Sequence, residues 1–460
     1  MIEFLIATAA FIVAIALLIA IHEFGHFIVA RKLGVRVEKF SVGFGPSLFS
    51  WYSRDGEVEY IIAAIPLGGY VKMLGESPSK QSDNPDQQKD SNADELTPED
   101  LKRAFHTQAV WKRAAIAVAG PAFNFIFAII AYMIVGWAGQ QVIPPMVGHI
   151  TPDSIAEQAG ILPADVIKKV NGHSVYAWQH VEEALKKTVG QPLTLTIDRT
   201  GMVMDVHMDV PMPEKDALLS NIGGSLLGFA AGQRVFAQQI TPHSAAAQAG
   251  LKDGDEIIRM DQQTVDDVRS LIQYIQSHAG MAITLGVMRG DLKMNLKITP
   301  QADAKTQRGR IGILLNARSI QAPVVYRMGR FEGAAYGFTR TWDMTTLTFE
   351  VLGKMMVNAI SPSNLGGPIA IAQMAGKTAE YGVIPYLLFL ALFSVNLGVL
   401  NLLPVPILDG GHLTYLSIEA LRGRPLSPET IEKTQLVGVL MIAALMIFAF
   451  YNDIARFLQG

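Results

Sequence analysis

The stretch FLIATAAFIVAIALLIAIHEFGH, from Phe4 to His26, passes directly from an apolar run into two histidines and a glutamate. No Asp, Glu, Lys or Arg occurs from Phe4 to Ile21. This length is close to the ~20 apolar residues that cross ~30 Å of hydrocarbon. The run lacks a positively charged start and a small-residue cleavage site, so we expect it to be retained as a first span, residues 1–33.

Three more stretches contain no Asp, Glu, Lys or Arg: residues 114–152, 381–408 and 434–452. Only 17% of all residues are charged, against roughly 25% in ordinary soluble domains. The pattern predicts a polytopic α-helical membrane protein with four transmembrane helices, and it argues against a water-soluble enzyme. We expect the later spans at residues 114–138, 383–410 and 434–452.

The charge balance and the cysteine content restrict the chemistry. The net charge of −3 provides no basic field for nucleic acid, so no nucleic-acid partner is expected. The chain has no cysteine, which excludes disulfide frameworks, thiolate nucleophiles and metal sites with Cys ligands. Any metal must therefore be held by His, Asp or Glu.

Lys and Arg flank the spans unevenly. They follow the first span, precede the second, and lie between the third and the fourth (Arg31, Lys32, Arg36, Lys39, Lys102, Arg103, Lys112, Arg113, Arg422, Arg424 and Lys433). Because cytoplasmic loops carry an excess of these residues, we expect these flanks in the cytoplasm. Both termini and the segment between the second and third spans then lie on the far side of the lipid bilayer.

The segment between the first two spans has two parts. Residues 34–75 are Gly-rich and β-prone, with a strand expected at Val58–Ile65, and we predict a membrane-associated β-rich loop there. Residues 76–104 are expected to be an acidic, flexible cytoplasmic insert, since Glu76 to Asp100 contains eight acidic and two basic residues.

An internal repeat follows the second span. ITPDSIAEQAGI, starting at Ile150, matches ITPHSAAAQAGL, starting at Ile240, at eight of twelve positions and an offset of 90. The second copy, SAAAQAGLKDGDEIIRMD, resembles a PDZ domain of the bacterial protease type, and the first departs from it at Leu162-Pro163-Ala164. We expect two tandem α+β PDZ domains, at residues 143–220 and 230–315. They can bind extended peptide ends or serve only as spacers or filters.

Aromatic residues interleaved with arginines characterise residues 324–360. Such a segment can form an amphipathic helix in the membrane interface. A helix packed against the far-side domains is the alternative.

His22-Glu23-Phe24-Gly25-His26 is the motif that points to catalysis. On a helix, residues i and i+4 lie on one face about 5–6 Å apart, so both imidazoles can meet one tetrahedral zinc ion. Zinc lowers the pKa of a water towards ~7, and Glu23 can take its remaining proton as general base. This is the arrangement of H-E-x-x-H metalloproteases.

Two histidines leave such a site one protein ligand short. The third apolar stretch ends in NLLPVPILDGG, Asn401 to Gly411, where two prolines prevent a regular helix beside an isolated carboxylate. Broken backbone at membrane depth is tolerated where it lines a cavity. We therefore expect Asp409 to be the third ligand, with His412 and Glu419 as alternatives.

In combination, HEFGH, AGPAFNF (Ala119 to Phe125), NLLPVPILDGG and the PDZ-like repeat resemble the site-2 protease family of intramembrane zinc metalloproteases. Four spans, two PDZ units, and GFGP plus IPLGGYVKM after the first span are similar to its bacterial regulator of sigma-E protease branch. The resemblance covers nearly the whole chain. It implies one zinc ion on His22, His26 and Asp409, with Glu23 as the catalytic base.

The resemblance also implies substrates and a compartment. We expect a multi-pass protein of the bacterial inner membrane, with both termini and the PDZ domains in the periplasm and the active site towards the cytoplasm. It would hydrolyse transmembrane segments of single-span proteins. These would be an anti-sigma factor already trimmed in the periplasm, during the envelope stress response, and signal-peptide remnants. The PDZ pair would gate access by excluding untrimmed substrates.

A substrate helix must unwind to expose the scissile carbonyl, and a strand edge could capture the unwound segment. Residues 58–71 are the candidate edge, consistent with the membrane-reentrant β-loop of the family, and we expect Gly68, Gly69 and Tyr70 to contact substrate. By resemblance, Asn401 holds substrate backbone; a helix-breaking cap is the alternative.

Two other classes of protein compete with a protease. A transporter would also place His, Glu and Asp within the membrane, but usually has more spans or inverted repeats. A membrane-anchored scaffold would explain the PDZ pair but not HEFGH.

Overall fold

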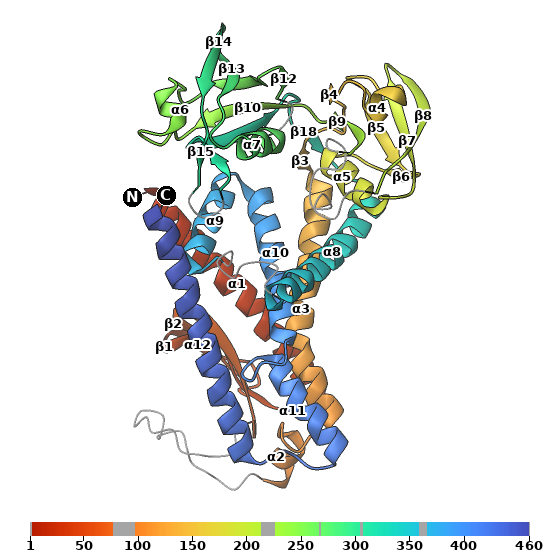
Figure 1. Cartoon of the computed structure of the whole chain (residues 1–460). Helices are drawn as coiled ribbons and strands as arrows, with labels where there is room; N and C mark the ends of the chain where they lie inside the picture. The colour runs from red at the N-terminus through yellow and green to blue at the C-terminus, as the bar shows by residue number, and fades with distance from the viewer. Residues whose placement is uncertain are drawn as a thin grey trace. The chain divides into compact units, whose positions relative to one another are not determined.

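The computed structural model describes residues 2–76, 97–212, 226–265, 268–303, 307–357 and 366–459 (Figure 1). The chain divides into two compact units. The first comprises Met1–Gly139 and Arg327–Gly460, and the second comprises Gln140–Tyr326. The second unit is therefore a continuous insertion between two helices of the first.

Among the described residues, four helices are long and apolar enough to cross a bilayer, as predicted. They are α1 (Ile2–Lys32), α3 (Val110–Ala138), α10 (Val383–Leu402) and α12 (Pro428–Gln459). Helix α12 extends beyond the expected span 434–452 at both ends, because its charged first turn is helical as well. Buried residues of α1 and α3 share hydrophobic clusters with residues of α10, for example Leu18 with Phe389 and Tyr132 with Val395.

The third span is shorter than the predicted range 383–410. Helix α10 ends at Leu402, residues 403–408 are not helical, and a new helix, α11 (Asp409–Arg422), begins at the aspartate. Pro404 and Pro406 lack backbone N–H groups, and each disfavours helical geometry in the residue before it. The prolines therefore separate one predicted span into a helix, a break and a second helix.

Two further helices of the first unit complete its framework. Helix α8 (Arg330–Met356) packs on α3, with Gly333 against Trp137 and Gly337 against Met133. Residues 324–360 were expected as one helical segment, but Val324–Tyr326 form strand β18 of the second unit and residues 358–360 lie outside the described residues. Helix α9 (Pro368–Glu380) was not predicted; it packs on α1.

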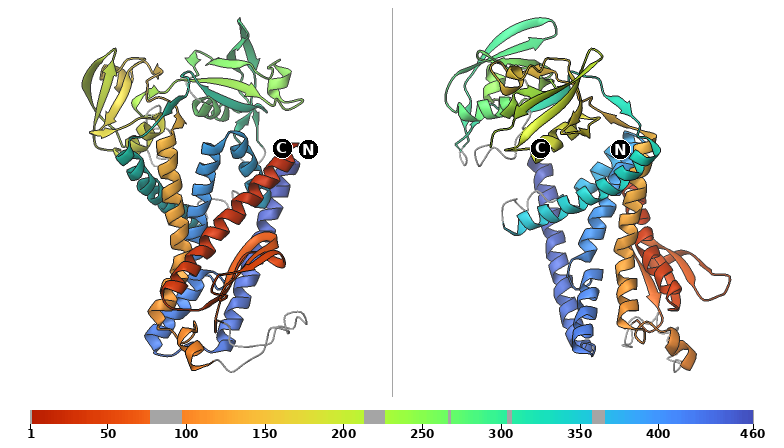
Figure 2. Two further views of the ribbon diagram at one scale, coloured as in Figure 1. Left: turned by 180° about the vertical axis from the view of Figure 1, so that it is seen from behind. Right: turned by 90° about the vertical axis from the view of Figure 1, so that its right-hand side faces the viewer.

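Strands β1 (Val37–Tyr52) and β2 (Glu59–Met73) form a sheet that lies along α1 (Figure 2). Both strands bend back on themselves. As a result, Phe40 lies beside Tyr60 on one side and beside Val71 on the other. Tyr60 also lies beside Trp51, so the first half of β2 occupies the interior of the sheet.

The pairing of β1 with β2 reduces the range of residues that can form the predicted substrate-binding edge. Residues 59–62 have neighbours on both sides, whereas residues 69–73 pair only with the start of β1. The expected edge at 58–71 is therefore wrong in its first half, because that strand is already paired on both sides. Gly69–Met73 therefore form one edge of the described sheet, which we call the free edge, and residues 47–52 form the opposite edge.

The acidic insert expected at residues 76–104 ends in a helix. Residues 77–96 lie outside the described residues, but α2 (Pro98–Arg103) follows them, and the side chain of Thr97 accepts a hydrogen bond from the backbone of Asp100. Arg103 donates two hydrogen bonds to Glu57, at 2.7 and 3.0 Å. These bonds attach α2 to the β1–β2 sheet, so this end of the insert is structured.

The second unit contains two copies of one α+β arrangement, each with its own core. The first repeat, residues 143–231, contains β4 (His149–Ile150), α4 (Ile155–Gln158), β5 (Val166–Val170), β6 (His173–Ser174), α5 (Trp178–Lys187), β7 (Pro192–Arg199), β8 (Met202–Asp209) and β9 (Phe229–Ala230). Its sheet has the order β6-β5-β7-β8, with β4 paired to β9. Its buried core includes Ile167, Leu195 and Phe229.

The second repeat spans residues 233–319. It contains β10 (Gln233–Gln238), α6 (Ala245–Gln248), β11 (Glu256–Met260), β12 (Gln263–Thr264), α7 (Val268–Ser277), β13 (Ile283–Arg289), β14 (Leu292–Ile298), β15 (Gln301–Ala302), β16 (Gly309–Arg310) and β17 (Leu314–Ser319). Its main sheet has the order β14-β13-β11-β10-β17, and β3 (Gln140–Val142) pairs with β18 at the two ends of the unit.

Both repeats extend beyond the ranges expected from sequence. The first was expected to end at residue 220, but Leu227 and Phe229 are buried in its core. The second was expected to end at residue 315, but β17 continues to Ser319. In each repeat the last strand returns to pair near the first, which brings sequence-distant residues into one core.

Candidate metal centre

His22 and His26 lie one turn apart on α1, and both side chains are buried. Their Nε2 atoms are 3.2 Å apart. Gly25 and Gly120 let α1 and α3 pack tightly beside this pair. A Cβ atom on Gly25 would lie 2.3 Å from the carbonyl oxygen of Ala119, and one on Gly120 would lie 2.3 Å from Nε2 of His26.

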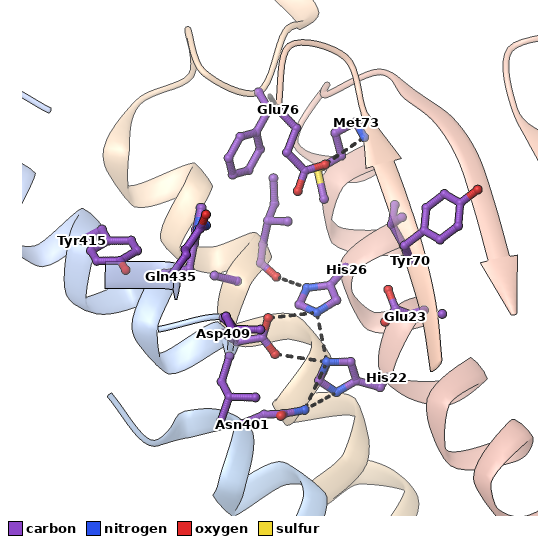
Figure 3. A pocket seen from close by; sticks show the side chains of 18 residues that line it. His22, Glu23, His26, Tyr70, Met73, Glu76, Asn401, Asp409, Tyr415 and Gln435 are labelled. Atoms are coloured by element: carbon purple, nitrogen blue, oxygen red, sulfur yellow. Dashed lines mark hydrogen bonds and ion pairs between the residues drawn. The ribbon is translucent and has the colours of Figure 1, made fainter. Parts of the chain in front are cut away.

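Asp409 reaches these histidines from the first residue of α11 (Figure 3). One carboxylate oxygen, Oδ2, is 3.0 Å from Nε2 of His22, and the other, Oδ1, is 3.4 Å from Nε2 of His26. Ligand atoms of the three residues all lie within 4.8 Å of one another. The structure thus brings together the three residues that the sequence suggested as metal ligands.

The donor set fits a zinc ion on two observations. Nδ1 of His26 faces the carbonyl oxygen of Ile116 at 2.8 Å and must donate to it, which leaves the lone pair of Nε2 facing the common centre. Oδ2 of Asp409 is buried and lacks a hydrogen-bond donor in suitable geometry, although Nε2 of His22 is close. A cation at this point would satisfy the buried oxygen.

Glu23 lies beside the histidines, on the side of the site where Tyr70 projects from β2 (Figure 3). A cavity of about 330 Å³ is lined by Glu23, the three candidate ligands, Gly69 and Tyr70. A Cβ atom on Gly69 would lie 3.0 Å from Cγ of Glu23. The free edge of the sheet therefore borders the candidate general base.

Gly68 does not line this cavity. It has φ +139°, and a Cβ atom there would collide with the ring of Phe44. We therefore ascribe to Gly68 a role in the turn before the free edge. The other two residues expected to contact substrate, Gly69 and Tyr70, do line the cavity.

Asn401 lies in the last turn of α10 and also lines the cavity. Its side-chain nitrogen is 3.4 Å from Nε2 and 3.5 Å from Nδ1 of His22. The side chain therefore points towards the site, and the described residues show no capping bond from it.

The two alternative ligands have other positions. Glu419 forms an ion pair with Arg113, which joins α11 to the start of α3. His412 lies on the cavity wall near the ring of Phe105, outside the three-ligand cluster. Neither residue competes with Asp409 for the common centre.

Several residues of the site were not predicted. Asn124, quoted above only as part of AGPAFNF, is completely buried and contacts His22. Glu76 and Gln435 also line the cavity. The i, i+4 spacing of Gly120 and Asn124 was the available signal, because it places both on the face of α3 that α1 covers.

Comparison with known proteins identifies the family. The model of Peptidase family M50 matches residues 10–445. The chain belongs to this family. The M50 match confirms the resemblance drawn from the motifs, and it identifies the chain as a metalloprotease with helices suited to the membrane.

Curated relatives of this M50 chain match it over nearly their full length. "Regulator of sigma-E protease RseP" of Salmonella typhimurium is 38% identical over 97% of this chain and 98% of its own. The protein of the same name from Escherichia coli K12 is 38% identical over 99% and 100%. "Putative zinc metalloprotease" of Vibrio cholerae is 38% identical over 97% and 98%. The last of these names supports zinc as the metal of the family. The four apolar helices, together with these relatives, fit a protein of the inner membrane.

One solved structure resembles a smaller part of this M50 chain. The PDZ domain of the SdrC-like protein of Listeria monocytogenes is 27% identical over 18% of this chain and 85% of its own, with a TM-score of 0.17.

Proposed function

We propose that His22, His26 and Asp409 hold one zinc ion and that Glu23 is the general base of peptide hydrolysis. The observation that carries this proposal is the convergence of the three ligand atoms, within 4.8 Å, in a cavity that Glu23 also lines. When bound, zinc would polarise the scissile carbonyl and lower the pKa of a water towards ~7.

The protein's own groups then move the proton and hold the substrate. Glu23 accepts a proton from the attacking water, whose oxygen forms the new bond to the carbonyl carbon. The protonated Glu23 returns that proton to the leaving amine as the C–N bond breaks. Asn401, at the cavity wall, can hydrogen-bond to the substrate backbone beside the scissile bond.

We further propose that the substrate is a transmembrane segment of a single-span protein, bound as an extended strand. The free edge offers unpaired backbone groups beside Glu23 at residues 69–72, whereas the backbone N–H of Met73 already donates to the carboxylate of Glu76. Adding a substrate strand there would satisfy the backbone of both partners and would keep the unwound segment at the site. Gly69 and Tyr70 would then contact the substrate directly.

We propose an anti-sigma factor, already trimmed in the periplasm, as one physiological substrate, and signal-peptide remnants as a second class. The relatives' names, regulator of sigma-E protease, support a membrane-protein substrate such as an anti-sigma factor. Both termini and the second unit, which we interpret as two tandem PDZ domains, would lie in the periplasm, with the metal centre towards the cytoplasm.

The catalytic proposal is tested with purified full-length protein and a labelled single-span substrate in detergent. Wild type should cleave it, chelation should stop cleavage, and zinc should restore it. Glu23→Gln should keep one zinc per chain and lose about 10²–10⁴-fold in rate, the usual contribution of a general base. Cleavage that survives both the substitution and chelation would refute the mechanism.

The gating proposal needs a separate variant. Because β3 and β18 pair at the two ends of the second unit, with Val142 opposite Val324, residues 143–323 can be replaced by a short Gly-rich turn. We expect this variant to cleave an untrimmed substrate faster than wild type and a trimmed substrate equally well. Unchanged discrimination between the two substrates would contradict gating by the PDZ pair.

A further inference from the structure

Asn124 is a fully buried polar residue in the middle of the apolar helix α3. A buried side-chain amide without partners costs free energy, so its contacts require an explanation. Its side-chain nitrogen lies 3.0 Å from Nδ1 of His22. Its side-chain oxygen is buried and has no hydrogen-bond donor among the described residues.

The metal centre sets a requirement on His22. An imidazole that binds a metal through Nε2 keeps its proton on Nδ1, and that N–H then needs an acceptor. His26 meets the same requirement through the carbonyl oxygen of Ile116. For His22, the group that faces Nδ1 at hydrogen-bond distance is the amide of Asn124.

The amide must present its oxygen to serve as this acceptor. Its two ends have nearly the same size, so a half-turn about the Cβ–Cγ bond exchanges them without other movement. The turn places Oδ1 opposite Nδ1–H of His22. Asn401 cannot replace it, because its amide is 3.5 Å from Nδ1 and equally close to Nε2.

We infer that Asn124 is a positioning residue of the metal centre: its side-chain oxygen accepts the Nδ1–H of His22 and directs Nε2 at the metal. The inference rests on the proposed zinc site. It assigns a role to two residues of the Ala119–Phe125 motif. Gly120 leaves room for the imidazoles, and Asn124, one turn later on α3, orients His22.

Zinc affinity, measured by competition with a chromogenic chelator, tests this role without any assay of cleavage. Asn124→Leu keeps the approximate size but removes the acceptor, and it should weaken zinc binding by about 10–100-fold, as loss of such partners does. Asn124→Asp keeps an oxygen acceptor and should bind zinc at least ten times more tightly than Asn124→Leu.

Asn396→Leu is the matched control. It removes an amide from the apolar helix α10, where Asn396 accepts a bond from Thr348 at 2.8 Å, away from the cavity. We expect its zinc affinity to equal that of wild type. Equal weakening by the control, equal affinity of the Leu and Asp variants at position 124, or wild-type affinity of Asn124→Leu would each overturn the inference.

A measurement on the wild-type protein does not depend on how the variants fold. With ¹⁵N-labelled histidine, zinc-loaded protein should show a protonated Nδ1 and a metal-bound Nε2 at His22. An unprotonated Nδ1 would overturn the inference. If the wild-type protein binds no zinc, the proposed zinc site itself is refuted. If the wild-type protein binds zinc and substitution of Asn124 does not change the affinity, only the role of Asn124 is refuted.

Discussion

Oδ2 of Asp409 lies 3.0 Å from Nε2 of His22, although Asp409 begins α11 and His22 lies in α1. Gly410 and Gly411 make this approach possible. A Cβ atom on Gly410 would lie 2.1 Å from the carbonyl oxygen of Leu403, and one on Gly411 would lie 2.3 Å from that of Val405. The two glycines let the first turn of α11 pack directly against the nonhelical residues 403–408. This close packing places Asp409 beside the histidines.

Asp409→Ala should lose bound zinc, because two imidazoles alone give an incomplete ligand set. We expect less than one tenth of the wild-type zinc content by elemental analysis after gel filtration. His412→Ala, on the same helix but outside the ligand cluster, should keep wild-type zinc content. If Asp409→Ala kept its zinc and His412→Ala lost it, His412 and not Asp409 would be the third ligand.

Gly120→Ala should disrupt the metal centre through a single methyl group. The new Cβ atom would lie 2.3 Å from Nε2 of His26 and 2.7 Å from Nε2 of His22, closer than real atoms approach. We expect zinc affinity to fall by at least about tenfold, on the scale of losses from misplaced ligands.

Gly353→Ala in α8 is the control for this substitution, since no atom of another described segment lies within 4 Å of its Cβ position. The alanine should leave zinc affinity unchanged and stabilise α8 by about 0.5–1 kcal/mol. Comparable zinc affinities of the two alanine variants would show that the space at Gly120 is not needed for the metal.

Gly69→Ala should slow cleavage while leaving zinc in place. Its Cβ atom would meet the carbonyl oxygen of Ser41 at 2.8 Å and Cγ of Glu23 at 3.0 Å, so the free edge or the carboxylate must shift. A shift of ~1 Å at a reacting group can cost about 10²-fold in rate. Zinc content and single-turnover cleavage, measured on the same sample, separate the two effects. An unchanged rate of cleavage would show that the free edge does not contribute to the active site.

Arg113→Ala should destabilise the first unit, because Glu419 would remain part-buried without its partner. Breaking such a pair costs about 3–5 kcal/mol, whereas replacing both charges with apolar residues is often neutral. We therefore expect the double variant Arg113→Met, Glu419→Met to be more stable than Arg113→Ala. Free energies of unfolding from detergent titration provide the comparison. A double variant no more stable than Arg113→Ala would indicate that the ion pair is not the source of the loss.

The second repeat has a pH-dependent ion pair between Arg289 and Asp255. Burial favours a higher pKa for Asp255. Two bonds from Arg289, each 2.7 Å, and one of 2.9 Å from the backbone N–H of Lys252 outweigh burial and hold the pKa below the usual ~3.9. The pair therefore contributes stability above pH ~4, and this contribution is lost as the pH falls through the lowered pKa.

Arg289→Ala should weaken this dependence. Burial then raises the pKa of Asp255 against only the backbone N–H and the charge of Lys252, so the variant should be less stable than wild type at pH 7 and should lose less stability as the pH falls towards 4. Hydrogen exchange of β11 and β13 in the full chain, corrected for intrinsic rates, measures the change. Arg259→Ala, which removes an exposed arginine of β11, is the control. A variant that loses as much stability on acidification as wild type would contradict this account of the pair.

Local features of the chain were sufficient to predict the four apolar helices and the internal repeat. A helix that crosses a bilayer is recognised by its length and its lack of charge, which are properties of one continuous segment. The i, i+4 spacing of His22 and His26 likewise specifies one face of one helix. Because the chain has no cysteine, the third ligand had to be a carboxylate or a histidine, and the structure brings Asp409 to the two histidines.

The remaining features depend on packing between segments far apart in the chain. Asn124 faces His22 only because α3 packs closely on α1, and Glu419 is occupied by Arg113 only because α11 returns to the start of α3. The free edge at Gly69–Met73 results from the bending of both strands of the sheet. No local periodicity encodes these relationships, because each one is set by how close two separate backbones can come.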